Sequence, residues 1–183
     1  MDFQILDFIQ THIRTPFLDD FFSRITHLGD AGTIWILIAV ILLFTKKYRK
    51  AGVGMLIAML VTYILGDHII KPLVGRARPF TYRDIKLLIP PPGQYSFPSG
   101  HTASSFCAAV SLFLYDKKLG IPAFVLAALI AFSRLYLYVH YPTDVLGGIL
   151  LGTVCAVTGS CCFDAMDTSM EQSETWSELM DSP

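Results

Sequence analysis

Charged residues are scarce in this chain. Only 16% of its 183 residues are Asp, Glu, Lys or Arg, whereas 53% are hydrophobic, and the mean hydropathy is +0.52. These values are unusual for a water-soluble domain and typical of a protein that crosses a membrane several times. The formal net charge is -1, so no excess of positive charge indicates a nucleic-acid partner.

Cysteine is also rare, and its spacing excludes a common type of zinc site. The four cysteines lie in or at the end of apolar runs, and we expect them to be small apolar side chains: Cys107, Cys155, Cys161 and Cys162. A basic leader is lacking too, because Met1-Asp2-Phe3 places no positive charge ahead of an apolar core. We therefore expect no cleavable signal peptide, and the first span would act as the insertion signal.

Five apolar runs are candidates for membrane-spanning helices. They cover approximately residues 31–45, 51–70, 102–115, 119–139 and 145–163. A hydrocarbon core about 30 Å thick requires about 20 helical residues, which the second, fourth and fifth runs provide. The first and third runs are shorter, so each alone could instead be a buried core helix. The sequence predicts an all-α polytopic membrane helix bundle with about five transmembrane helices.

Segments with a different pattern flank this bundle. Apolar residues recur at helical spacing in residues 3–13 and again after Pro16, which predicts two amphipathic helices on the membrane surface or against the bundle. The expected organisation is N-terminal amphipathic helices in residues 1–30, a transmembrane domain in residues 31–163 and an acidic cytoplasmic tail in residues 164–183.

Two short basic loops predict the orientation. Lys46–Lys50 follows the first run and Asp116–Lys118 follows the third, and short basic loops favour the cytoplasmic side. The loop at residues 71–101 and the turn at residues 140–143 would then face the extracytoplasmic side. This loop is itself basic, which weakens the asymmetry unless some of its cations bind a ligand: Arg76, Arg78, Arg83 and Lys86.

The first of three polar clusters begins that loop. Lys71 and Arg78 bracket a turn that contains proline and glycine, and both side-chain types bind phosphate oxygens. The alternative is a basic loop that only flanks the membrane. Asp67 and His68 precede this cluster by about one helical turn. They could pair with the site or simply reach the membrane interface, and we favour the second alternative.

The second cluster is Pro98-Ser99-Gly100-His101, just before the third run. Ser99 is a good N-cap, and Gly100 permits close approach of a ligand to the backbone. A helix N-terminus at this point would offer free N–H groups to an anion. His101 could protonate a leaving oxygen, or the whole cluster could be a simple cap with a solvated histidine.

The third cluster lies between two long apolar runs, where ionisable groups are costly and often functional. Pro142 disfavours helix at Tyr141 and can open a new one, so we expect His140 to end one helix and Asp144 to lie in the first turn of the next. The carboxylate could then hold the imidazole in one tautomer. The alternative is a tight loop with a snorkelling Arg134 and a capping Asp144.

All three clusters fall on one side of the expected bundle. Together they supply cations, two imidazoles, a carboxylate and an anion-binding helix end, which are the groups that phosphoryl transfer without a metal requires. The motifs Lys-x6-Arg-Pro, Pro-Ser-Gly-His and Ser-Arg-x5-His-x3-Asp occur in order between Lys71 and Asp144. This pattern resembles the signature of the type 2 phosphatidic acid phosphatase superfamily, whose members are membrane lipid phosphatases.

The resemblance implies a role for each motif residue. His140 would be the nucleophile that becomes a phosphohistidine, Asp144 its orienting partner and His101 the general acid. A phosphate clamp would comprise Lys71, Arg78, Ser99, Gly100 and Arg134. The resemblance implies neither a metal nor any other cofactor.

The resemblance also implies a lipid phosphate or diphosphate as substrate, reached from the extracytoplasmic side of the cell membrane. Undecaprenyl diphosphate ranks first, because small bacterial members of the family commonly act on it. Phosphatidylglycerophosphate or phosphatidic acid ranks second, since the motif residues recognise the phosphate group and not the lipid tail. A protein that binds or transports lipid phosphates without chemistry is a third possibility, and the oligomeric state is not predicted.

Overall fold

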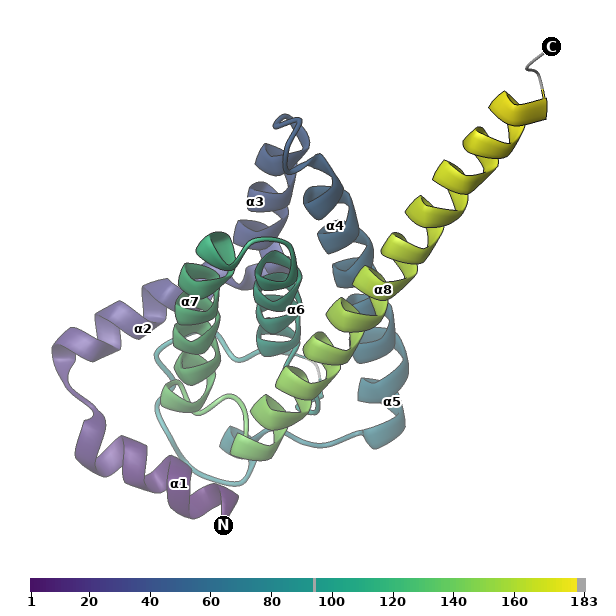
Figure 1. Ribbon diagram of the computed structural model, residues 1–183. Coiled ribbons are helices and arrows are strands. Elements are labelled where there is room, and N and C mark those ends of the chain that lie inside the picture. Colours follow the sequence, from purple (N-terminus) through teal and green to yellow (C-terminus); the bar gives the residue numbers. More distant parts are fainter. Residues whose placement is uncertain (94, 181–183) are drawn as a thin grey trace.

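The computed structural model describes residues 1–93 and 95–180, and within them every regular element is helical (Figure 1). The elements are α1 (Asp2–Phe8), η1 (Ile9–Ile13), α2 (Pro16–Leu28), η2 (Asp30–Gly32), α3 (Thr33–Leu43), α4 (Arg49–Tyr63), η3 (Ile64–Ile70), α5 (Lys71–Val74), η4 (Pro79–Thr81), α6 (Gly100–Tyr115), α7 (Lys117–Tyr136) and α8 (Pro142–Met180). The all-α prediction is therefore confirmed.

Helix α6 lies at the centre of the bundle, in contact with α4, α7 and α8 (Figure 1). Small residues make these contacts close. A methyl group on Gly148 of α8 would lie 2.7 Å from the carbonyl oxygen of Ser99 and 2.9 Å from Cβ of Thr102. This approach brings the start of α8, which carries the last residue of the third motif, against the start of α6, which carries the second motif.

The outward surfaces of the helices around α6 are apolar. Exposed aliphatic side chains on α3, α4 and α8 include Ile36, Leu37, Ile41, Ile57, Leu60, Leu146, Leu150 and Val154. A soluble monomer rarely exposes so large an apolar surface, whereas a bilayer requires one. The chain is accordingly a multi-pass membrane protein.

Three stretches are helical, long and apolar enough to span a bilayer: Arg49–Thr81, Lys117–Tyr136 and Pro142–Cys161. A fourth span is possible if Pro16–Leu28 and Asp30–Leu43, which meet at a 47° bend, form one broken span. The predicted number of five is therefore not confirmed. Helix α6 has 16 residues, about 24 Å, and falls below the 18-residue length of a candidate span. That its apolar run crosses the bilayer stays a prediction.

The two N-terminal helices pack onto the end of α7. The hydroxyl of Tyr136 donates a hydrogen bond to Asp19 Oδ1 of α2 at 2.7 Å, and that of Tyr138 donates to Asp7 Oδ1 of α1 at 2.7 Å. Because both tyrosines are buried, these bonds hold α1 and α2 against the bundle.

The two basic loops lie together at one end of the molecule. The hydroxyl of Tyr48 donates to Asp116 Oδ2 at 3.0 Å, and that of Tyr115 donates to the Lys47 carbonyl at 2.5 Å. The first turns of α6 and α8 and the short helix α5 lie at the opposite end (Figure 1). The fold thus separates the basic loops from the three polar motifs.

Helix α8 continues past the bundle through Met180 (Figure 1). The predicted acidic tail, residues 164–183, therefore begins inside this helix, and residues 181–183 lie outside the described residues. The division into segments 1–30, 31–163 and 164–183 stays a prediction.

Candidate active site

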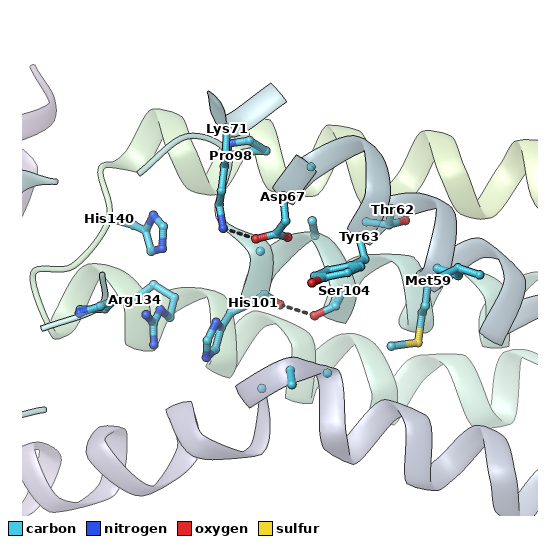
Figure 2. A pocket seen from close by; sticks show the side chains of 18 of the residues that line it. Met59, Thr62, Tyr63, Asp67, Lys71, Pro98, His101, Ser104, Arg134 and His140 are labelled. Carbon is cyan, nitrogen blue, oxygen red and sulfur yellow. Dashed lines mark hydrogen bonds and ion pairs between the residues drawn. The ribbon is translucent and has the colours of Figure 1, made fainter. Parts of the chain in front are cut away.

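A cavity of about 580 Å³ lies where the three polar motifs meet. The motif residues that line it are Lys71, Arg78, Gly100, His101, Arg134 and His140. Figure 2 shows the labelled His140, Arg134 and His101 side chains toward one end of the pocket and Met59 toward the other. The pocket thus has a polar end and an apolar end.

The three predicted cations are buried at the polar end. Lys71 and Arg78 are each 6% exposed, and Arg134 is 3% exposed. Arg78 Nη1 donates to the Val139 carbonyl at 2.8 Å, and Arg134 Nη1 donates to Thr26 Oγ1 of α2 at 2.5 Å. Both of these acceptors are neutral oxygens, and a phosphate bound at this end would add charge-assisted hydrogen bonds to the guanidinium groups.

The Nε–H group of Arg134 is buried, and among the described residues it has no hydrogen-bond partner. An unsatisfied buried N–H on a charged group is expensive and often marks a functional position. A phosphate oxygen has the charge and the acceptor capacity that this group lacks.

The start of α6 forms one wall of the polar end. Ser99 is the N-cap, as expected, and its Oγ accepts hydrogen bonds from Thr102 Oγ1 at 2.9 Å and Thr102 N at 3.4 Å. A methyl group on Gly100 would lie 3.3 Å from Asp67 Oδ2 and 3.5 Å from Lys71 Nζ. Glycine therefore lets both side chains approach the free N–H groups of this helix end.

The turn that carries His140 differs from the prediction. Helix α7 ends at Tyr136 rather than at His140. Tyr138 has a positive φ of 59°, and the backbone N–H groups of Val139 and His140 both donate to the Arg134 carbonyl, at 3.2 and 3.3 Å. The chain therefore leaves the helix a turn early, in a compact loop.

His140 and Asp144 form the predicted pair. His140 Nδ1 lies 3.4 Å from Asp144 Oδ2, and Nε2 lies 3.1 Å from Arg78 Nη1. Because a guanidinium only donates, Nε2 accepts and the imidazole proton is assigned to Nδ1, facing the carboxylate. The Nε2 lone pair is then directed toward the cations.

The surroundings of His140 keep it neutral. Burial, and then the positive charges of Arg78 and Arg134, hold the pKa of His140 well below its ordinary value, against the opposing hydrogen bond from Asp144. A neutral imidazole is the form that can attack phosphorus.

Asp144 has more partners than its motif suggests. Its buried carboxylate accepts hydrogen bonds from the Tyr141 backbone N–H at 2.8 Å, from Arg76 Nη1 at 2.7 Å and from the Ser96 hydroxyl. Arg76 and Ser96 were not predicted. The sequence offers only the proximity of Arg76 to the first motif as a signal, and it does not separate Arg76 from the other basic residues of the loop.

One carboxylate, Asp67, lines the pocket, and a second, Asp30, contacts a side chain that lines it. The expectation that Asp67 lies at the membrane interface is wrong, because Lys71 Nζ donates to Asp67 Oδ1 and Asp67 lines the cavity (Figure 2). His68 is exposed and packs edge-on against Tyr63, with ring centroids 4.9 Å apart. Asp30, which no motif indicated, lies 2.8 Å from His101 Nε2.

The chain is similar to several known proteins. Residues 47–166 match the family model described as the PAP2 superfamily. An undecaprenyl-diphosphatase from Sulfolobus acidocaldarius is 37% identical over 122 residues, which are 66% of this chain and 59% of that protein. Phosphatidylglycerophosphatase B from Bacillus subtilis is 36% identical over 152 residues, 76% of this chain and 72% of that protein.

A similar fold is known from a crystal structure. It is described as that of a transmembrane PAP2-type phosphatidylglycerolphosphate phosphatase from Bacillus subtilis. The alignment has a TM-score of 0.74 and 30% sequence identity, and it covers 90% of this chain and 85% of the other. The similarity therefore extends beyond the motifs to the arrangement of the helices.

Proposed function

Because this chain belongs to the PAP2 superfamily, we propose that it hydrolyses the phosphate or diphosphate group of a membrane lipid, with undecaprenyl diphosphate as the first-ranked substrate. The observation that carries the proposal is the position of His140 Nε2, 3.1 Å from Arg78 Nη1, at the edge of a buried cluster of cations. A phosphate bound by that cluster would lie next to the nitrogen lone pair.

The reaction would proceed in two steps. His140 Nε2 attacks phosphorus, the P–N bond forms, and the bond from phosphorus to the leaving oxygen breaks with its electron pair on that oxygen. His101 donates a proton to this oxygen, while Asp144 stabilises the positive charge that develops on His140. A water molecule, deprotonated by His101, then attacks phosphorus, and the P–N bond breaks to release phosphate and neutral His140.

The cations would stabilise both transition states. Charge accumulates on the three equatorial phosphate oxygens during transfer, and buried donors aimed at them act strongly because little water screens them. These donors would be the side chains of Lys71, Arg78 and Arg134, the Ser99 hydroxyl and the Gly100 backbone N–H. A cationic set of this kind does not suit a metal ion, and we expect metal-independent hydrolysis.

The apolar end of the cavity supports a lipid substrate. Ile36 of α3 and Leu56, Met59 and Leu60 of α4 line it. Ile36 and Leu60 are also exposed on the apolar outer surface, so an alkyl or prenyl chain could extend from the phosphate site toward the bilayer. No residue of this lining separates a prenyl chain from an acyl chain, so phosphatidylglycerophosphate and phosphatidic acid are the second candidates.

We also propose that the site faces the extracytoplasmic side of the cell membrane. The connections that lead into α4 and α7, which carry the basic loops, lie at the opposite end of the bundle from the first turns of α6 and α8, and basic loops favour the cytoplasm. A substrate would then enter from the outer leaflet.

Phosphate release by the purified full chain in detergent tests the proposal. The panel is undecaprenyl diphosphate, phosphatidylglycerophosphate and phosphatidic acid, and the ranking predicts the highest kcat/KM for the first. His140→Ala is expected to lower turnover by more than about 10³-fold while binding of phosphatidic acid is largely retained. His12→Ala, which removes an exposed imidazole outside the pocket, is the control.

Two results would contradict the proposal. A wild-type protein that binds the lipids but releases no phosphate would instead be a binding or transport protein. Wild-type turnover by His140→Ala would exclude His140 as the nucleophile.

A further inference from the structure

A carboxylate from outside the three motifs contacts His101. Asp30 Oδ1 is 2.8 Å from His101 Nε2, and Asp30 Oδ2 is 2.7 Å from His27 Nδ1. Asp30 begins η2, in the connection between α2 and α3, so it comes from a part of the chain that contains none of the three motifs. None of the roles proposed above uses it.

The backbone before Asp30 is shaped to receive the His101 ring. A methyl group on Gly29 would lie 2.8 Å from His101 Cδ2 and 2.9 Å from Ile130 Cγ2 of α7. Contacts this short would force the ring or the turn to move. The glycine therefore allows the imidazole to lie directly against the turn that carries Asp30.

The turn itself is tight and conformationally restricted. Ala31 and Gly32 both have positive φ, 51° and 69°, and the Gly32 N–H donates to the Gly29 carbonyl at 3.1 Å. A non-glycine residue such as Ala31 seldom adopts this conformation, and the cost must be compensated by the surrounding structure. Asp30 is thus presented to His101 by a turn with little freedom.

We propose that Asp30 is a positioning residue for His101, whose carboxylate accepts the Nε2 proton and stabilises the imidazolium that protonates the leaving oxygen. This inference rests on the proposed phosphatase function. With Nε2–H bound to Asp30, Nδ1 is the nitrogen that gives its proton to the oxygen as the bond from phosphorus to that oxygen breaks. The site would then contain two Asp–His pairs: His140 with Asp144 for the nucleophile, and His101 with Asp30 for the acid.

The charges around His101 explain why such a partner is needed. Burial, and then the positive charges of Arg134 of α7 and Lys71 of α5, lower the pKa of His101 to about 4, against the opposing hydrogen bond and charge of Asp30. Asp67 of η3 and the neutral His140 line the same cavity, while His27 of α2 shares the Asp30 carboxylate. The cations that bind the phosphate would thus work against the general acid, and Asp30 is the carboxylate in hydrogen-bond contact with it.

Leaving-group dependence tests this inference. A good leaving group needs little protonation, whereas an alkoxide needs much, so loss of the acid affects alkyl phosphates selectively. Asp30→Asn keeps an acceptor for Nε2 and removes the charge. It is expected to lower kcat/KM for phosphatidic acid by roughly 10- to 100-fold and that for p-nitrophenyl phosphate by less than about 3-fold.

The pH profile offers a second readout. Because loss of the negative charge lets His101 lose its proton more easily, the alkaline limb of the phosphatidic acid profile is expected to move to lower pH in Asp30→Asn. A merely structural role would lower the whole profile without moving it. Asp20→Asn is the control, since Asp20 is an exposed carboxylate on α2 that pairs with Arg24 at 2.9 Å.

A double-mutant cycle completes the test. In a His101→Ala background, Asp30→Asn is expected to cause no further loss, because the acid it serves is already absent. Equal losses with both substrates, or an additive loss in the cycle, would overturn the inference.

Asp30→Ala, at a position that is 53% exposed, provides the same comparison if Asp30→Asn is poorly folded. If the wild type releases no phosphate from either ester, the proposed function itself fails.

Discussion

Replacing Arg76 by alanine is expected to weaken both the fold and the nucleophile, because one guanidinium joins three elements. Arg76 Nη1 donates to Asp144 Oδ1 and to Thr143 Oγ1, each at 2.7 Å, and Nη2 donates to Asp2 Oδ2 at 2.8 Å. The guanidinium also lies 3.8 Å from the centre of the Tyr141 ring. Arg76 therefore ties α1 to the first turn of α8.

The expected decrease in the free energy of unfolding depends on the hydrogen bonds that Asp144 retains in the variant. Removing one partner of a fully buried ion pair costs about 3–5 kcal/mol, and a single hydrogen bond to a charged group contributes about 1.5–3 kcal/mol. The lower range applies here, because the Arg76 side chain is 30% exposed and Asp144 retains the Tyr141 N–H and the Ser96 hydroxyl. We expect the free energy of unfolding to decrease by about 2 kcal/mol.

The same change should slow catalysis. With one of its anchors gone, the Asp144 carboxylate holds His140 less firmly, and a misplaced nucleophile loses much of its effective concentration. We expect kcat for phosphatidic acid to decrease about tenfold with a smaller change in KM, because Arg76 does not line the main cavity.

Arg83→Ala is the matched control. Arg83 also contacts α1, at 3.6 Å from Asp7 Oδ2 and 5.1 Å from the centre of the Phe3 ring, but it makes no contact with Asp144. Its side chain is 52% exposed, so its removal should change the free energy of unfolding by less than about 0.5 kcal/mol. Thermal unfolding in detergent and phosphate release are measured for both variants. Equal effects of the two substitutions would refute the reasoning.

Two further predictions concern pH and inhibitors. Because the fold lowers the pKa of His140 below its ordinary value of 6.5, the free energy of unfolding should be independent of His140 above about pH 6.5 and should decrease as pH falls below it. Denaturant titrations of the wild type and His140→Gln across this range measure the effect, and an opposite slope would contradict it. Vanadate should inhibit hydrolysis, since it can adopt the trigonal-bipyramidal geometry of phosphoryl transfer. A chelator should leave activity unchanged, and strict dependence on an added divalent ion would indicate another mechanism.

Local patterns were sufficient to predict much of this molecule. Scarce charge and long apolar runs predicted an all-α membrane bundle, because a bilayer accepts few other backbones. Ser99 and Pro142 predicted the starts of α6 and α8, because an N-cap and an N1 proline act within one turn. The end of α7 was placed one turn too late, because the positive φ of Tyr138 depends on carbonyl contacts that no local signal encodes.

The sequence by itself determined which residues form the three motifs, because each motif has fixed internal spacing. Only the tertiary structure decided what surrounds them. Asp67, four residues before Lys71, is the exception, because helical spacing alone brings these two side chains together. Asp30 and Arg76 are ordinary charged residues in the sequence, and each is a partner of a motif side chain because the packing of distant segments placed it within hydrogen-bond distance. Short-range contacts between distant segments carry no periodicity or spacing that could be read from the chain.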